Sequence, residues 1–232
     1  MKFRMNSIFT VCIIVSLALA SGATGLAQDT FQVTVHNLTG SQLITPPLVV
    51  VHDSSTSLFT VGQPASAELA TLAEEGNPMP LMEAAMGMEG VFDTGVAFGP
   101  GDPPVIPPGE SASVMVEATP QYKWLSVVGM LATTNDSFFA VSRVELPVRV
   151  AFYFLGPRSL TVSAPAYDAG SEANSESCDF IPGPPCGNHV HDPAEAEGFV
   201  HISNGVHGAG DVNAADADWR NPVARVTITR VD

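Results

Sequence analysis

The chain has 232 residues, with 24 Asp and Glu against 9 Lys and Arg, and a formal net charge of −15. Such a surface repels nucleic-acid phosphates and anionic lipid and favours divalent cations, so we expect no nucleic-acid partner. Nothing in the sequence repeats at a fixed period, which argues against a solenoid or propeller.

The N-terminus has the pattern of a secretory signal peptide. Lys2 and Arg4 precede an apolar run over residues 8–20, and small residues then lead to Ala27. The run is too short to span a bilayer of about 30 Å, so we predict a signal peptide over residues 1–27, with a retained anchor as the alternative. Cleavage removes two basic residues and takes the net charge from −15 to −17. We expect a secreted or periplasmic protein with no transmembrane segment in its mature part, residues 28–232.

Apolar residues alternate with polar ones at both ends of the mature chain. Phe31, Val33 and Val35 alternate at the start, and Ala224, Val226 and Ile228 do so at the end, which is typical of strands with one buried face. We expect further strands near residues 47–52, 57–61, 111–118, 123–133, 137–143, 146–155, 159–164 and 198–203. Short strands separated by turn residues predict one all-β domain, an antiparallel β-sandwich.

Two short helices are expected between the strands. Residues 65–76 are rich in helix formers and stop at Gly76, and a second helix is expected over residues 81–86. Methionines gather around this second helix, at positions 79, 82, 86 and 88. They could form a ligand surface, but we favour gap-filling in the core.

A long irregular segment over residues 165–197 holds seven acidic residues and the two cysteines of the mature chain. Loops of this length are usually functional or disordered. Cys178 and Cys186 are an even pair in an oxidising compartment, so we predict a disulfide; the spacing does not fit a zinc knuckle.

Acidic residues in two places could hold a hard cation. Asp168 and Glu172 flank Gly170 directly after a predicted strand, and Asp136 lies in a polar break between two others. Calcium prefers six to eight oxygen ligands, and two carboxylates are too few without a second loop. From spacing alone, a solvated turn is the better explanation of each cluster.

Several segments resemble the spondin domain, a module of the extracellular matrix protein F-spondin and of secreted single-domain bacterial proteins. They comprise residues 33–39, 58–62, 168–172 and 221–228. The resemblance implies a C2-domain-like β-sandwich, similar to calcium-dependent phospholipid-binding domains, with one Ca²⁺ held by loops at one end. The family's calcium carboxylates fall on Asp136, Asp168 and Glu172, the last being aspartate in animal members.

Histidines offer a second site. His189, His191 and Glu195 resemble the first metal motif of cupins, with His207 as a possible fourth ligand, although Ile202 stands where that motif has glycine. Flanking prolines favour a loop here, whereas cupins carry these histidines on a strand. The alternative function is therefore a cupin-type extracytoplasmic metalloenzyme.

Other signatures of chemistry are absent from the sequence. Residues 211–218 only partly match a calcium loop and are expected to be an acidic surface turn. No Gly-x-Ser-x-Gly elbow, phosphate loop or dinucleotide fingerprint occurs. The sequence therefore predicts a monomeric, non-catalytic calcium-binding module whose partner is a protein or glycan.

Overall fold

A computed structural model describes residues 28–150, 153–154 and 157–231. The predicted signal peptide, residues 1–27, lies outside the described residues. Among the described residues, no helix is both long and apolar enough to cross a membrane.

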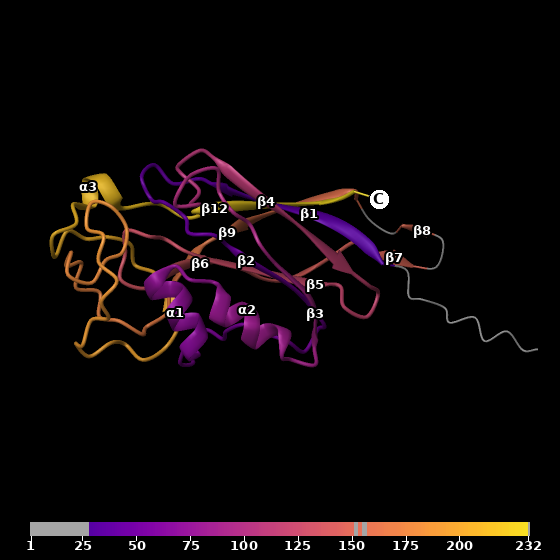
Figure 1. Ribbon diagram of the computed structural model, residues 1–232, viewed down its shortest axis with the longest axis horizontal. Coiled ribbons are helices and arrows are strands. Elements are labelled where there is room, and N and C mark those ends of the chain that lie inside the picture. Colours follow the sequence, from indigo (N-terminus) through magenta and orange to yellow (C-terminus); the bar gives the residue numbers. More distant parts are fainter. Residues whose placement is uncertain (1–27, 151–152, 155–156, 232) are drawn as a thin grey trace, which may run out of the picture.

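Two antiparallel sheets stack into a sandwich, which confirms the predicted all-β class (Figure 1). The four-stranded sheet has the order β4 (Ser111–Ala118), β1 (Asp29–Asn37), β12 (Ala224–Arg230) and β9 (Ser159–Ala164). The six-stranded sheet has the order β11 (His201–Ile202), β10 (Ala166–Asp168), β6 (Ser137–Glu145), β5 (Trp124–Met130), β2 (Leu48–His52) and β3 (Val91–Val96). The last strand, β12, pairs over its full length with the first strand, β1, from Phe31↔Arg230 to Asn37↔Ala224.

The core has two layers, which explains why β2 does not alternate. Val49 and Val51 face the space between the sheets, whereas Leu48 and Val50 face the opposite side. That outer face is covered by α1 (Ala67–Glu75) and α2 (Met79–Met86), which lie together on the six-stranded sheet in Figure 1. A strand buried on both faces is apolar throughout, and every residue of β2 is buried.

Local signals set the limits of α1. The Leu69 N–H donates to the Ser66 hydroxyl at the N-terminus (3.2 Å), and the Gly76 N–H donates to the Leu72 carbonyl at the C-terminus. Gly76 has φ +69°, and a Cβ there would lie 2.4 Å from Cγ2 of Thr45. Glycine is therefore required both for the backbone conformation and for the close packing.

Some predicted elements are wrong. Residues 57–61 form no strand, because turns on both sides bend the chain, although Leu58 stays buried. The strand expected at 198–203 shrinks to β11, and part of that expected at 146–155 lies outside the described residues, with β7 (Arg149–Val150) and β8 (Tyr153–Phe154) paired. Strands β3 and β10 were missed, and the one-turn helix α3 (Ala214–Ala217) lies in the segment expected to be a turn.

Most of the methionines in and just after α2 do not pack in the core, contrary to expectation. Met82 packs against the outer core layer, but Met79, Met86 and Met88 are 42%, 64% and 40% exposed. The helix buries Leu81 and Ala85 instead, since these lie on the face that meets the sheet.

We predict that Leu72→Ala lowers the free energy of unfolding by about 2–5 kcal/mol, because Leu72 is fully buried beneath α1. Met86→Ala, at an exposed position of the neighbouring helix α2, should change it by less than about 0.5 kcal/mol. Urea unfolding of the two variants checks this. Equal changes in the free energy of unfolding in the two variants would mean that the helices do not contribute to the core.

Candidate metal centre

Asp136 lies in the turn between β5 and β6 and is fully buried. Its Oδ2 accepts hydrogen bonds from the N–H groups of Ser171 (2.8 Å) and Glu172 (3.0 Å) and from the Ser171 hydroxyl (3.2 Å). Its main-chain carbonyl accepts a further bond from the Ala169 N–H. Asp136 therefore holds the loop that follows β10. Its Oδ1 is buried and has no hydrogen-bond partner among the described residues.

Asp168 ends β10 and is placed by strand pairing opposite Ser137, the neighbour of Asp136. Its Oδ1 accepts a bond from the Gly170 N–H (2.8 Å) and its Oδ2 from the Asn174 amide (2.9 Å). Gly170 has φ +62°, and a Cβ there would lie 2.3 Å from the Phe199 carbonyl oxygen. The glycine thus permits the left-handed backbone conformation with which the chain turns after β10.

Aromatic packing fixes β10 on the opposite face. The Tyr167 ring stacks on Phe138 with centroids 5.7 Å apart and meets the edge of Phe59 at 5.1 Å. Because side chains alternate along a strand, this packing turns the Asp168 carboxylate to the other face, towards the loop cluster.

The buried carboxylates have unusual acidities. Burial, together with the charge of Asp168, raises the pKa of Asp136 to about 8. Burial also raises the pKa of Asp168, partly offset by its hydrogen bonds to Asn174 and Gly170, and raises that of Glu172 to about 7. Two carboxyl groups in one desolvated place cannot both ionise without a compensating positive charge.

A third carboxylate and a histidine complete the surroundings of Asp168. The Asn174 amide donates to both Asp168 Oδ2 and Glu197 Oε1, the latter at 3.1 Å. His201 Nε2 lies 3.4 Å from Asp168 Oδ1. Asp168, Glu197 and His201 can each offer one ligand atom within 4.8 Å of the others. Asp168 and Glu197 border a polar cavity of about 210 Å³ that Asn174, Glu176 and His207 also line.

The Glu172 carboxylate lies in a different cluster from the carboxylates of Asp168 and Glu197. The Glu172 N–H holds Asp136, but its carboxylate Oε1 accepts a bond from the Asp192 N–H (2.7 Å) and lies 3.1 Å from His191 Nδ1. With Glu74 and His191 it forms a second group of three ligand atoms within 4.8 Å, and Asp136 belongs to neither group. The structure thus joins Asp136 to Asp168 and to the backbone of Glu172, while the Glu172 carboxylate belongs to another cluster.

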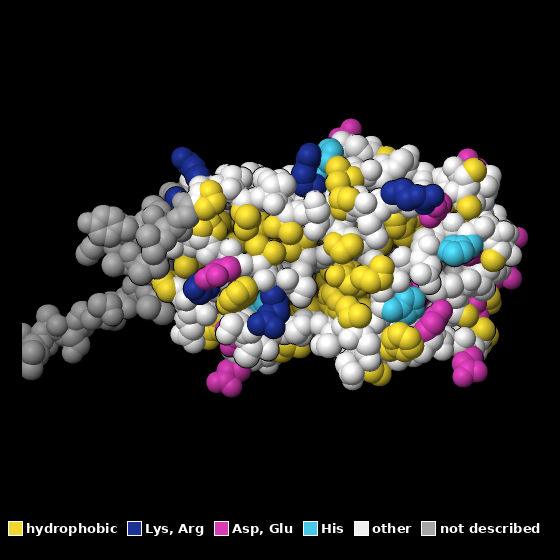
Figure 2. Space-filling view, turned by 180° about the vertical axis from the view of Figure 1, so that it is seen from behind, with side chains coloured by type: hydrophobic (Ala, Val, Ile, Leu, Met, Phe, Trp, Pro, Cys, Tyr) yellow, Lys and Arg dark blue, Asp and Glu magenta, His cyan; other side chains and the backbone are white. Residues whose placement is uncertain are grey.

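The cupin-type set is dispersed. His191 is the one member of that set in either group, whereas His207 lines the Asp168 cavity and its ring Nε2 lies 3.0 Å from the Asn204 carbonyl oxygen. Glu195 is exposed, and residues 186–198 form no strand, as the flanking prolines predicted. Histidine and acidic side chains lie together at this loop end in Figure 2, but not in the arrangement of that motif.

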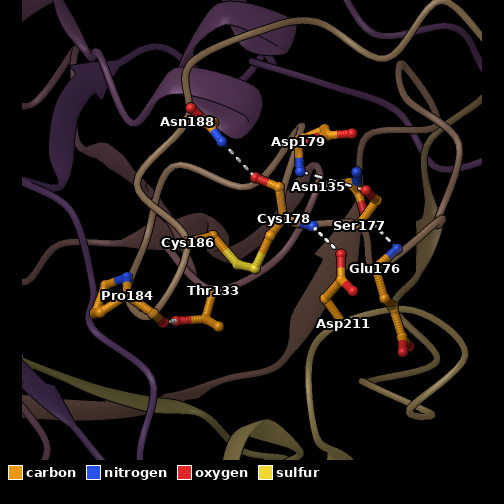
Figure 3. Close-up of a disulfide and its surroundings, with 10 residues drawn as sticks. All are labelled: Thr133, Asn135, Glu176, Ser177, Cys178, Asp179, Pro184, Cys186, Asn188 and Asp211. Carbon is orange, nitrogen blue, oxygen red and sulfur yellow. Dashed lines mark hydrogen bonds between the residues drawn. A yellow bond between two sulfur atoms is a disulfide. The ribbon is translucent and has the colours of Figure 1, made fainter.

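The predicted Cys178–Cys186 disulfide is confirmed, and it lies close to the Asp136 turn (Figure 3). The Thr133 hydroxyl donates to the Pro184 carbonyl within the bridged loop (2.9 Å), and the Glu176 N–H donates to Asn135 Oδ1 (3.1 Å). The Cys178 N–H donates to Asp211 (3.0 Å). The disulfide loop is therefore tied on one side to the β5–β6 turn and on the other to the segment before α3.

Sequence reasoning missed Glu74, Asn174 and Glu197. Glu74 lies on α1, about a hundred residues before the acidic segment, and no local pattern distinguishes it from its neighbour Glu75. Glu197 is itself exposed, like Asp179 and Glu195 of the same segment, so nothing local distinguishes it from a solvated acidic residue. Asn174 and Glu197 come near Asp168 only because the chain turns at Gly170 and at Gly198. The Gly198 N–H donates to the Gly170 carbonyl and so joins the two turns.

The raised pKa values predict a pH dependence of stability in the metal-free protein. In the unfolded chain, the carboxyl groups have pKa values of about 4. The folded state therefore binds their protons more tightly, and stability is lost as the pH rises from about 4 towards 8. With a chelator present, Tm should fall between about pH 5.5 and about pH 8, which both lie inside that window. Asp136→Asn, which cannot ionise, should show a flatter profile; an identical slope would contradict this account.

No family model matches the chain, and no curated protein matches it. The resemblance to the spondin domain therefore stays a prediction that rests on the short segments named above. The side chains at the loop end of the sandwich, chiefly the buried carboxylates of Asp136 and Asp168, are what point to a function.

Proposed function

We propose that this protein is an exported, non-catalytic interaction module in which one Ca²⁺ stabilises the loops at one end of the β-sandwich. The observation that carries the proposal is the buried Asp136 Oδ1, which has no hydrogen-bond partner among the described residues and lies beside a second buried carboxylate, Asp168. A buried, unpaired carboxylate oxygen is costly, and a cation removes that cost.

Most of the donor atoms are oxygens, which favour a hard cation, and the His201 imidazole, 3.4 Å from Asp168 Oδ1, stays outside the proposed ligand set. Asp136, Asp168 and Glu197 supply carboxylate oxygens, and Asn174 can supply an amide oxygen after a flip of its side chain. In the metal-free arrangement, the Asn174 NH₂ lies between Asp168 and Glu197, where a positive charge is favourable. Calcium takes six to eight oxygens, and water in the adjoining cavity of about 210 Å³ can supply the others.

Glu197 replaces Glu172 as the third carboxylate in this proposal. The Glu172 side chain turns towards Glu74 and His191, while its N–H keeps Asp136 in place. A glutamate carries one methylene more than the aspartate of the animal proteins, which is consistent with a carboxylate that extends past the site rather than into it.

The consequence of ion binding is an ordered loop surface. Asp168, Asn174 and Glu197 lie in one continuous segment, so an ion that binds all three cross-links its two ends. We propose that the partner, a protein or glycan, binds these ordered loops. The basic, apolar and small-residue pattern of residues 1–27 supports export to a compartment where millimolar calcium and disulfides are common.

Calcium should raise the stability of the wild-type protein by roughly 2.7 kcal/mol at a hundredfold excess over Kd, because it binds the folded state alone. The measurement is Tm in calcium against Tm in EGTA. Asp136→Asn should lose this calcium-dependent increase but keep or raise the Tm measured in EGTA, since an amide relieves the repulsion from Asp168.

Asp179→Asn is the matched control. It removes one negative charge from the same acidic segment, but Asp179 is exposed and its carboxylate makes no hydrogen bond among the described residues. Its response to calcium should equal that of the wild type. A wild-type Tm that is the same in calcium and in EGTA would refute the proposed function.

A further inference from the structure

A second cluster of metal-ligating side chains lies where α1 meets the loops. His191 Nδ1 is 3.0 Å from Glu74 Oε2 and 3.1 Å from Glu172 Oε1. The three residues come from α1, from the loop after β10 and from the segment after the disulfide. Nothing in the proposed calcium site requires Glu74 or His191, so the cluster calls for its own explanation.

The distances fit donor atoms around one ion. Donors bound about 2.1 Å from a metal lie about 3.0 Å apart when they subtend a right angle and about 3.4 Å apart at the tetrahedral angle. The two measured N···O separations are close to the first value. A modest movement of the exposed His191 side chain reaches the second.

Glu172 provides an independent sign of a ligand. Its side chain is 1% exposed, and its Oε2 is buried with no hydrogen-bond partner among the described residues. Oε1 is held by the Asp192 N–H, so the carboxylate is fixed and presents an unsatisfied oxygen. A cation beside Oε2 would satisfy it.

The surrounding space has the size of an ion. A cavity of about 20 Å³ is lined by Glu74, Glu75, Glu172, His189 and His191 together with Val190. That volume accommodates about one water-sized sphere. His189 and Glu75 can therefore add ligands, and the 58% exposed His191 side chain leaves a path from solvent.

We infer that Glu74, Glu172 and His191 form a binding site for a first-row transition-metal dication such as Zn²⁺, which fastens α1 to the loop cluster. An imidazole nitrogen with carboxylates suits zinc, whereas calcium prefers oxygen ligands alone. The site is separate from the proposed calcium site, because the carboxylates of Asp136 and Asp168 belong to neither its ligands nor its cavity.

The test is a calorimetric titration of the chelator-treated full chain with ZnCl₂, with calcium present to occupy the other site. We expect one equivalent of zinc to bind. Loss of even an outer-shell partner costs roughly 10–100-fold in metal affinity, so His191→Ala and Glu74→Gln should each weaken zinc binding by at least about tenfold. His36→Ala, on β1 of the other sheet, is the matched control and should bind zinc as the wild type does.

Cobalt(II) supplies a readout that a merely structural role would not change. Visible d–d absorption should appear when Co²⁺ is added to the wild type and disappear in His191→Ala, which removes an exposed side chain and should still fold. Zinc affinity unchanged in both variants, or no zinc binding by the wild type, would overturn the inference. Asp136→Asn separates the two sites, because it should lose the calcium response yet retain zinc binding.

Discussion

The loop end of this protein depends on one buried carboxylate, Asp136. Its Oδ2 accepts three hydrogen bonds from Ser171 and Glu172, and its carbonyl accepts the Ala169 N–H, so one side chain in the β5–β6 turn organises the whole loop after β10. These bonds require a charged or strongly polar acceptor at a buried position. Because Asp168 is brought beside it by strand pairing, the same arrangement that orders the loop also accumulates negative charge.

Two structural features keep these charges together. On one side, Tyr167 packs against Phe138 and Phe59 and anchors β10 to the outer layer of the core. On the other, the Cys178–Cys186 disulfide loop is tied to the β5–β6 turn through Thr133 and Asn135. The carboxylates therefore cannot separate to reduce their repulsion. Protonation or a bound cation remains as the means of neutralising them, and the proposed calcium site follows from that constraint.

The two ends of the short stretch from Asp168 to Glu172 contribute to different proposed sites. One uses oxygen donors around Asp168, and the other combines the Glu172 carboxylate with Glu74 of α1 and His191. Since Glu172 contributes its N–H to Asp136 and its side chain to the second cluster, the backbone couples the two. Occupation of both would connect the β5–β6 turn, α1 and the long loop into one rigid surface for a partner.

The sequence by itself determined the sandwich, because alternation in β1, β4, β9 and β12 and turn residues between strands are local signals. It also predicted the disulfide and a helix that ends at Gly76, and it singled out Asp136 and Asp168 as candidate ligands. Only the tertiary structure decided the rest. Residues 57–61 turn rather than extend, three methionines face solvent, and β3, with Asp93 and Gly95, forms only because β2 offers it an edge. Which carboxylates share a site depends on side-chain direction: Glu172 points to Glu74 and His191, and Glu197 reaches Asp168 through Asn174. Contacts between residues so far apart in the chain arise from packing, and no local pattern records them.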